Sequence, residues 1–293
     1  RPSAVGTSRV MSLHVSTTAI PRSLRSTLEA FDEIGIKRVE CGYCSDPGID
    51  LGDLLADYDF EYVAHNYFRP VDDEFIVNLA SSDPSIRDRS IEYVCQCIQF
   101  CDDHNIDLYT FHAGFRVDPS LDLVFPDEGV QPYSTAMDRF FDALKLVLDR
   151  TAGTDVSLAV ENNVVSEENR FEDGAKLLLA RPDGASEFVN RLPSSVGILL
   201  DTGHLTVSAE TFGFSRDAFL DIVAPSVRCL HLHDNDGLRD RHEPPALGSW
   251  PLRVYTETFD GTIPATIEAS FESKIDLQEY LRVMRNSNVH EIS

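Results

Sequence analysis

Short runs of apolar residues alternate along the chain with stretches in which apolar residues recur every three or four positions. The short runs predict β-strands, and the stretches between them predict amphipathic helices. Strands that alternate with helices are typical of βαβ units and a parallel sheet. Eight strands are predicted, over Ser12–Ser16, Arg38–Cys41, Tyr62–His65, Leu108–His112, Ser157–Glu161, Val196–Asp201, Val227–His233 and Thr262–Ala269.

Several of the helical stretches carry signals for their ends. Gly35 follows the stripe formed by Leu24, Leu28 and Phe31 and predicts a helix end. Asp83 and Pro84 form an N-cap and first-turn pair before the next long stripe. Eight strands with helices between them favour an α/β fold of one (β/α)8 TIM barrel over an open sheet.

The chain shows no internal linker rich in Gly, Pro or Ser. We therefore expect one TIM-barrel domain over residues 1–293, with residues 1–10 as a poorly ordered N-terminal extension. The segment from Gly237 to Pro251 contains three prolines and two glycines and predicts a long loop on the functional rim.

The charge of the chain narrows the classes of partner. Its 293 residues include 25 Lys and Arg against 49 Asp and Glu, a formal net charge of −24, which argues against nucleic acid as a partner. No apolar run reaches the roughly 20 residues that a membrane span needs, and Arg1 to Arg9 lack the apolar core of a signal peptide. We expect a cytoplasmic protein that does not bind membranes.

Acids and imidazoles stand at the carboxyl ends of seven of the eight predicted strands. They are Glu40, His65, His112, Glu161, Asp201 with His204 three residues later, His231 with His233, and Glu268. In a TIM barrel these strand ends surround one mouth. Burying so many acids and imidazoles around it would be costly unless a cation neutralised the carboxylates, so the pattern predicts a divalent metal.

Four of these residues come from four consecutive predicted strands and so can surround one ion. They are Glu161, Asp201, His231 and Glu268. Three carboxylates and one imidazole suit Mn²⁺, Mg²⁺ or Co²⁺, and Zn²⁺ accepts the same ligand types. The identity of the metal stays open.

The segments around these residues resemble the xylose isomerase-like TIM barrel superfamily, which includes sugar phosphate isomerases and epimerases and the endonuclease IV repair enzymes. The resemblance extends over nearly the whole chain. It rests on Tyr62-Val-Ala-His65, Asn78-Leu-Ala-Ser81, Thr110-Phe-His-Ala-Gly114, Val160-Glu-Asn162, Leu200-Asp-Thr-Gly-His204, His231-Leu-His-Asp-Asn-Asp-Gly237 with Asp240-Arg-His242, and Ile267-Glu268.

The isomerase and epimerase branch implies that Glu161, Asp201, His231 and Glu268 bind one metal. Glu161 and Glu268 would then be the catalytic pair, exchanging a proton with the substrate through a metal-stabilised enediolate. His204 would hydrogen-bond the substrate. On this interpretation the chain is a divalent-metal-dependent isomerase or epimerase that acts on a sugar, a sugar phosphate or a polyol derivative in carbohydrate metabolism.

The endonuclease IV branch implies up to three zinc ions and a phosphodiesterase that acts on abasic DNA. It would add His65, His112, His204, Asp240 and His242 to the ligands, and His233 is a further candidate for metal or substrate binding. The negative charge favours the isomerase, because a nuclease must hold phosphates. One feature differs from the isomerase branch: this loop reads Ala246-Leu-Gly-Ser249, where members of that branch often end it with a Gly-x-Gly turn. A metal-stabilised binding barrel without catalysis is the third hypothesis.

Other residues are candidates for the wall of the pocket. Tyr67 and Trp250 offer aromatic faces for a sugar. Arg239 offers a guanidinium for a phosphate or carboxylate, and Glu40 stands at a strand end. The expected partner is a small sugar-like molecule. A homo-oligomer is also possible, because related barrels often associate.

Overall fold

Eight parallel strands close into a barrel in the computed structural model, which describes residues 13–286 except 46–47, 72 and 173. The order around the barrel is β1-β10-β9-β8-β5-β4-β3-β2, which confirms the predicted TIM barrel. The predicted extension over residues 1–10 lies outside the described residues. The barrel strands are β1 (Leu13–Ser16), β2 (Arg38–Cys41), β3 (Glu61–His65), β4 (Leu108–His112), β5 (Ser157–Glu161), β8 (Val196–Asp201), β9 (Val227–Leu232) and β10 (Ala265–Ile267).

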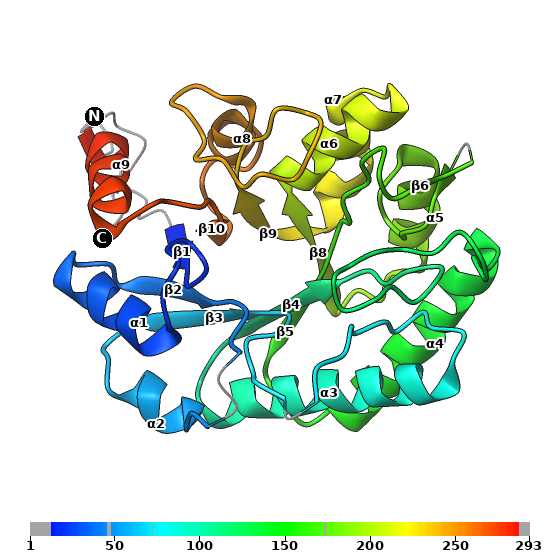
Figure 1. Cartoon of the computed structure of the whole chain (residues 1–293), viewed down its shortest axis with the longest axis horizontal. Helices are drawn as coiled ribbons and strands as arrows, with labels where there is room; N and C mark the ends of the chain where they lie inside the picture. Colours follow the sequence, from blue (N-terminus) through cyan, green and yellow to red (C-terminus); the bar gives the residue numbers. More distant parts are fainter. Residues whose placement is uncertain (1–12, 46–47, 72, 173, 287–293) are drawn as a thin grey trace, which may run out of the picture.

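Helices surround the strands (Figure 1). None of those in the described part of the chain is both long and apolar enough to cross a bilayer. The helices are α1 (Leu24–Glu33), α2 (Leu51–Ala56), α3 (Pro84–Asp103), α4 (Tyr133–Arg150), α5 (Pro182–Arg191), α6 (Thr202–Phe212), α7 (Arg216–Val223), α8 (Trp250–Arg253) and α9 (Lys274–Asn286), with short turns η1 (Ala224–Ser226) and η2 (Val254–Thr258).

The predicted helix ends agree with local geometry. The side chain of Asp83 accepts a hydrogen bond from the Ser85 backbone at 2.8 Å, and Pro84 opens α3. Helix α1 ends at Glu33, and Gly35 has a φ of 75°, a left-handed conformation that glycine adopts without strain. A short hairpin of β6 (Arg170–Phe171) and β7 (Gly174–Ala175) was not predicted, because two-residue strands leave no periodic signal.

The alternation of side chains along the strands divides the molecule into two environments. Ala64, Val160 and Leu230 belong to the large core between the strands and the surrounding helices. The neighbouring positions form a separate apolar cluster of Val63, Leu108, Ala159, Leu199 and Cys229. Since successive side chains on a strand face opposite sides, this second cluster fills the barrel interior.

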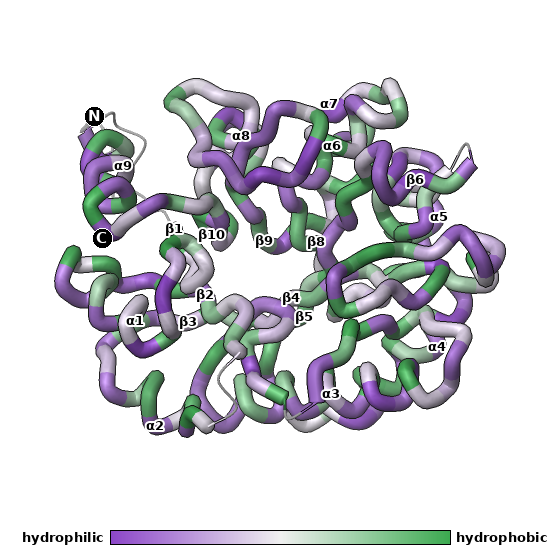
Figure 2. Tube along the Cα trace, viewed as in Figure 1, coloured by the Kyte–Doolittle hydropathy of each residue, from purple (hydrophilic) through white to green (hydrophobic). Residues whose placement is uncertain are grey.

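Two residues further along four of these strands, the inward positions become polar. They carry His65, Glu161, Asp201 and His231. The apolar cluster therefore forms a floor beneath a polar layer at the mouth. The loop after β9 is mostly hydrophilic (Figure 2).

Asn78 ties together the loops that follow β3 and β4. Its side-chain oxygen accepts hydrogen bonds from the backbone N–H groups of Ala80 at 3.1 Å and Phe115 at 2.9 Å. Its side-chain nitrogen donates to the Phe115 carbonyl at 3.2 Å and to Asp118 at 2.7 Å. The side chain is fully buried, so water cannot replace a lost hydrogen bond and each group needs its partner in this set.

We expect Asn78→Ala to lower the free energy of unfolding by about 2–4 kcal/mol, because it leaves buried backbone groups without partners. Urea unfolding followed by circular dichroism measures the change. Gln99→Ala, which removes an exposed amide bonded to Asp103, should change it by less than about 0.5 kcal/mol. Equal effects of the two substitutions would contradict this role of Asn78.

Candidate metal centre

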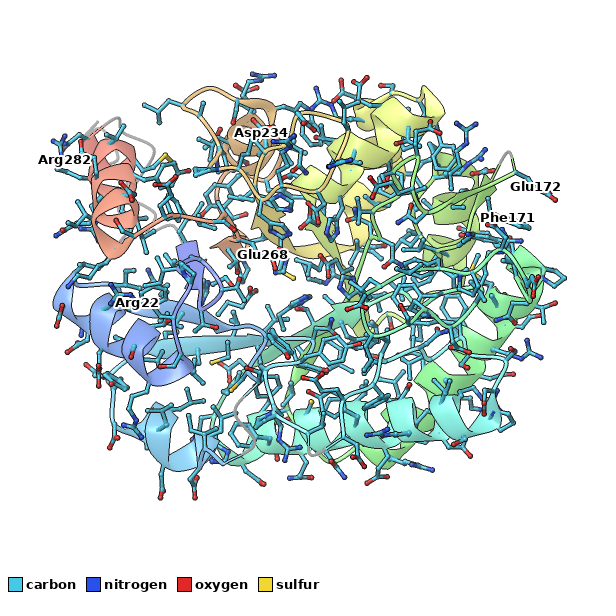
Figure 3. The ribbon with its side chains drawn as sticks, in the orientation of Figure 1. Arg22, Phe171, Glu172, Asp234, Glu268 and Arg282 are labelled. Carbon is cyan, nitrogen blue, oxygen red and sulfur yellow. The ribbon has the colours of Figure 1, made fainter. Side chains whose placement is uncertain are left out.

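The predicted strand-end residues meet at one end of the barrel. Glu268 lies near the centre of the ring of strands in Figure 3, whereas Arg22, Glu172 and Arg282 lie at the periphery. Ten His, Asp and Glu residues form four groups, three of which share residues, and within each group the ligand atoms lie within 4.8 Å of one another. They are His65, His112, Glu161, Asp201, His204, His231, His233, Asp240, His242 and Glu268.

The first group consists of His65, His112 and Glu161, at the ends of β3, β4 and β5. His65 Nε2 lies 3.4 Å from Glu161 Oε2, and His112 Nδ1 lies 3.0 Å from the same oxygen. Strand pairing sets this geometry, because Glu161 lies directly opposite His112 in the register of β4 and β5. Two imidazoles and one carboxylate are ligand types that a catalytic Zn²⁺ would accept.

The second group contains the four residues that the sequence predicted around one ion. His231 Nδ1 lies 2.8 Å from Glu268 Oε2, 3.7 Å from Asp201 Oδ2 and 3.6 Å from Glu161 Oε1. Glu161 thus directs one oxygen to each of the two groups, so it would be shared if both groups held ions. A further group of His65, His231 and Glu268 joins them.

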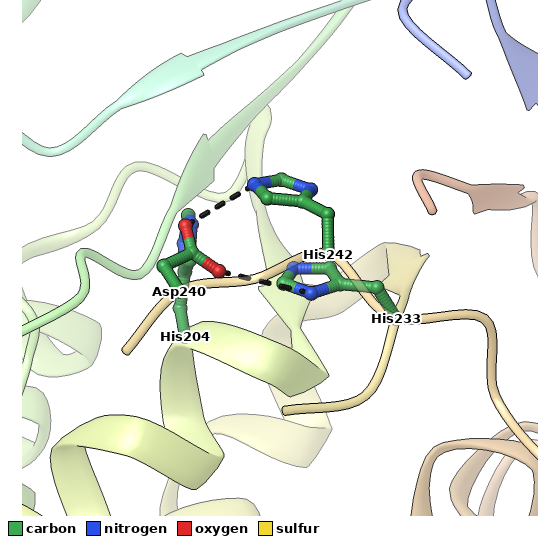
Figure 4. Close-up of side chains that lie close together, drawn as sticks. All are labelled: His204, His233, Asp240 and His242. Atoms are coloured by element: carbon green, nitrogen blue, oxygen red, sulfur yellow. Dashed lines mark hydrogen bonds and ion pairs between the residues drawn. The ribbon is translucent and has the colours of Figure 1, made fainter. Parts of the chain in front are cut away.

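The third group consists of His204, His233, Asp240 and His242 (Figure 4). One Asp240 oxygen lies 3.2 Å from His204 Nε2 and 3.1 Å from His242 Nε2, and the other lies 3.8 Å from His233 Nδ1. The ring of His233 stacks on that of His242, with centroids 4.1 Å apart. A side chain at Gly203 would collide with His233, because an added Cβ would lie 2.0 Å from its ring.

Backbone hydrogen bonds fix the loop that carries Asp240 and His242. Asp234 and Glu243 exchange backbone hydrogen bonds of 2.7 and 2.9 Å, which close the loop at its base. The His242 carbonyl accepts from the Ser270 N–H at 2.7 Å. Asp240 and His242 lie within the segment from Gly237 to Pro251 that was predicted to form a long rim loop.

A hydrogen bond on the far side of each ring orients most of these imidazoles. His65 Nδ1 bonds to Thr110 Oγ1 at 2.8 Å, and His204 Nδ1 donates to the Asn162 carbonyl at 2.9 Å. His242 Nδ1 donates to the Glu268 carbonyl at 2.7 Å.

Two further imidazoles are oriented by carboxylates. His231 Nε2 donates to Glu40 Oε2 at 2.8 Å, and His233 Nε2 donates to Asp201 Oδ2 at 2.9 Å. With one nitrogen donating on the outer side, the other nitrogen faces the cluster and would offer its lone pair to a bound cation.

The cluster favours positive charge. Burial would lower the pKa of His231, but Glu268 and Glu40 hold it well above the usual value. Burial likewise opposes protonation of His242, whose pKa the hydrogen bond to Asp240 and the charge of Glu268 raise to about 10. Burial would raise the pKa of Glu161, and His112 and His65 keep it below its ordinary value. His112 differs, because burial lowers its pKa to about 4.

Several polar atoms of the cluster fit metal ions rather than hydrogen bonds. Six buried atoms lie close to oppositely charged neighbours but make no hydrogen bond of acceptable geometry to a described residue: both carboxylate oxygens of Glu161, Nδ1 of His112, His231 and His233, and one oxygen of Glu268. Buried polar atoms are rarely left unpaired. Divalent cations would use these lone pairs, and the high share of imidazole suits Zn²⁺.

A cavity of about 500 Å³ opens above the cluster. Tyr67, one of the four pocket candidates from the sequence, is among the residues that line it. Glu40 instead lies buried behind His231, Arg239 pairs with Glu168 at 3.0 Å, and the Trp250 indole donates to Asp217 at 3.2 Å. None of these three is among the described residues that line the cavity.

Thr110 and Asn162 orient cluster residues but were not predicted. Thr110 could have been found, because it lies two residues before His112 and so faces the barrel interior. The apolar side chains that line the outer cavity, including Leu121, Leu123 and Phe125, come from the loop after β4. A loop sequence without periodicity gives no signal for their position.

The chain belongs to the family described as xylose isomerase-like TIM barrel, whose model matches residues 26–266. It is 23% identical over 222 residues to a probable endonuclease 4 of Aquifex aeolicus (strain VF5), covering 69% of this chain and 70% of that protein.

Among solved structures, a D-tagatose 3-epimerase-like protein has a TM-score of 0.67 at 20% identity, covering 94% of this chain and 99% of that one. Endonuclease IV from Thermus thermophilus has a TM-score of 0.61 at 15% identity, covering 94% of this chain and 98% of that one. At these identities the solved structures establish the fold alone.

We expect Glu40→Ala to weaken zinc binding about 10- to 100-fold, the usual effect of losing an outer hydrogen-bond partner of a ligand. Glu40 also accepts from Thr266 Oγ1 at 3.0 Å, so stability is measured in parallel. Glu40→Gln retains an acceptor oxygen and should restore most of the affinity. Competition titration with a chromophoric chelator reports the change.

The matched control is Glu61→Ala, on the neighbouring strand, where the carboxylate is exposed and bonds Arg38. It should bind zinc like the parent chain. Parent-like zinc affinity of Glu40→Ala would show that Glu40 does not position His231.

Proposed function

We propose that this chain is a metal-dependent phosphoester hydrolase that binds three divalent ions, with Zn²⁺ as the preferred metal. One observation carries the proposal: the three groups around Glu161, His231 and Asp240 lie side by side and together use ten potential ligands. A single-metal isomerase needs only the group of Glu161, Asp201, His231 and Glu268. It leaves the paired imidazoles of the other two groups unexplained.

In this proposal His65, His112 and Glu161 hold the first ion, and Glu161, Asp201, His231 and Glu268 hold the second. His204, His233, Asp240 and His242 hold the third. When bound, such ions would stabilise the charge that develops on a transferring phosphoryl group and lower the pKa of a water nucleophile.

The chain itself supplies orientation and exclusion of water. The outer hydrogen bonds from Thr110, Asn162 and Glu40 fix which imidazole nitrogen faces the cluster. The apolar floor formed by Val63, Leu108, Ala159, Leu199 and Cys229 closes the barrel below. Substrate therefore reaches the cluster only from the cavity side. The relatives named endonuclease 4 support phosphoester chemistry.

A second candidate is a sugar isomerase or epimerase. Glu161 and Glu268 both face His231 within one group, and their side chains are only 1% and 12% exposed. These are the two carboxylates that the resemblance implies for proton exchange. The fold shared with an epimerase-like protein supports this candidate as well.

Metal analysis and two activity assays separate the candidates. We expect about three zinc ions per chain, and hydrolysis of bis(4-nitrophenyl) phosphate, 4-nitrophenyl phosphate or an abasic duplex. His112→Gln should reduce hydrolysis by more than about 100-fold. Loss of a hydrogen-bond partner of a ligand already costs up to about that much, and in this proposal His112 is itself a ligand. His104→Gln changes a histidine on the outer surface and is the control.

A different combination of results would overturn the hydrolase proposal. One ion per chain, together with uptake of solvent deuterium into a keto sugar and no phosphoester cleavage, would establish the isomerase instead. Glu268→Gln should then abolish the label uptake.

A further inference from the structure

The cavity above the cluster has two chemically different ends. Its inner end is formed by cluster residues such as His112, Glu161 and Asp240. Its outer end is formed by side chains from the loops after β2, β3 and β4. We call this outer end the apolar wall and define it by Tyr43, Phe75, Phe115, Leu121, Leu123 and Phe125.

The apolar wall exposes large side chains to water. Tyr43 is 56% exposed, Leu121 57% and Leu123 56%. Single exposed apolar residues are ordinary, but a group of them that lines a cavity marks a binding surface. An apolar ligand would remove this surface from water.

Interactions behind the apolar wall hold it in place. The Phe75 ring contacts Arg89, whose guanidinium carbon is 4.0 Å from the ring centroid, and meets the Tyr93 ring edge-on, with centroids 5.9 Å apart. Phe115 packs edge-on against Phe125, with centroids 5.2 Å apart. The Phe125 carbonyl accepts from Lys176 Nζ at 2.9 Å. The wall is therefore largely preformed.

The rim offers little positive charge to a polyanion. Arg69 is the single Lys or Arg among the described lining residues, and its guanidinium carbon lies 5.4 Å from the Phe100 ring centroid. Lys176 pairs with Asp127 at 2.6 Å, Arg239 with Glu168 at 3.0 Å and Arg241 with Asp236 at 2.8 Å. A duplex lying over this mouth would place its phosphates near these carboxylates.

From these observations we infer that the substrate is a small phosphoester whose alcohol part is apolar and about the size of one ring. The inference rests on the proposed hydrolase function and names its substrate class. The phosphate lies at the inner end, where the metal ions would meet its charge. The apolar group lies against the apolar wall, and no second phosphate is bound.

Binding of non-hydrolysable probes to the zinc-loaded protein tests this inference. Isothermal titration calorimetry compares phenylphosphonate with methylphosphonate, which share the phosphonate and differ in the apolar group. We expect phenylphosphonate to bind about 10- to 50-fold more tightly, as expected for burying one ring. In a Leu121→Asn, Leu123→Asn double variant the ratio should fall towards one, while methylphosphonate binds as before.

Leu247→Asn is the matched control, because Leu247 is an exposed loop leucine that is not among the lining residues. It should keep the parent ratio, and thermal melting of all variants checks that they are folded. Asn suits position 123, where φ is 57°.

Failure of the substrate inference and failure of the proposed hydrolase function give different results. Equal binding of the two phosphonates, alongside phosphoester hydrolysis, would overturn the inference and leave the hydrolase intact. An abasic duplex that competes better than phenylphosphonate would also overturn it and would favour DNA. Binding of neither phosphonate to the zinc-loaded protein would overturn the inference and the proposed function together.

Discussion

The mutual repulsion of buried carboxylates is the constraint on which the mouth of this barrel depends. Glu161, Asp201 and Glu268 share one small volume with His231, and Glu40 lies directly behind it. Carboxylates in such a site are tolerated only beside positive charge. The raised pKa values of His204 and His231 express the same requirement, since Asp201 and Asp240 favour a proton on His204, and Glu268 and Glu40 favour one on His231. One divalent cation would supply as much positive charge as two protonated histidines, and it would accept the lone pairs of the imidazoles and carboxylates.

The backbone determines where these charges meet. Parallel register places Glu161 opposite His112 and His231 opposite Asp201, so neighbouring strands deliver their last inward side chains to one level. Asp201 then begins α6 as its N-cap, and its Oδ1 accepts from the His204 N–H at 2.6 Å. One residue thus ends a strand, caps a helix and places the next imidazole. The apolar floor one layer below keeps these groups in a low-dielectric environment.

The sequence predicted those parts of the molecule that follow from periodicity. Arg38–Cys41, Leu108–His112, Ser157–Glu161 and Val196–Asp201 coincide with strands of the structure, whereas the predicted strand Thr262–Ala269 shortens to Ala265–Ile267. The strand-end rule found most of the clustered residues because strand ends converge in any closed barrel. It placed Glu40 at the end of β2 but did not predict its hydrogen bond to His231. It also gave no position for Trp250, which packs on α7 with Arg216 over its ring. Those positions depend on contacts between distant elements that have no period.

The cluster and the apolar wall are built on different kinds of structure. Much of the cluster rests on strand ends and on α6, whose geometry the barrel fixes, whereas the apolar wall comes from the loops after β2, β3 and β4. Loops tolerate change in sequence far better than paired strands. Substitutions at Leu121 or Leu123 would therefore change the apolar wall and leave the strand ends that carry the cluster in place. That separation gives a physical reason why one barrel frame supports nucleases and epimerases alike, and why the fold alone does not determine the substrate.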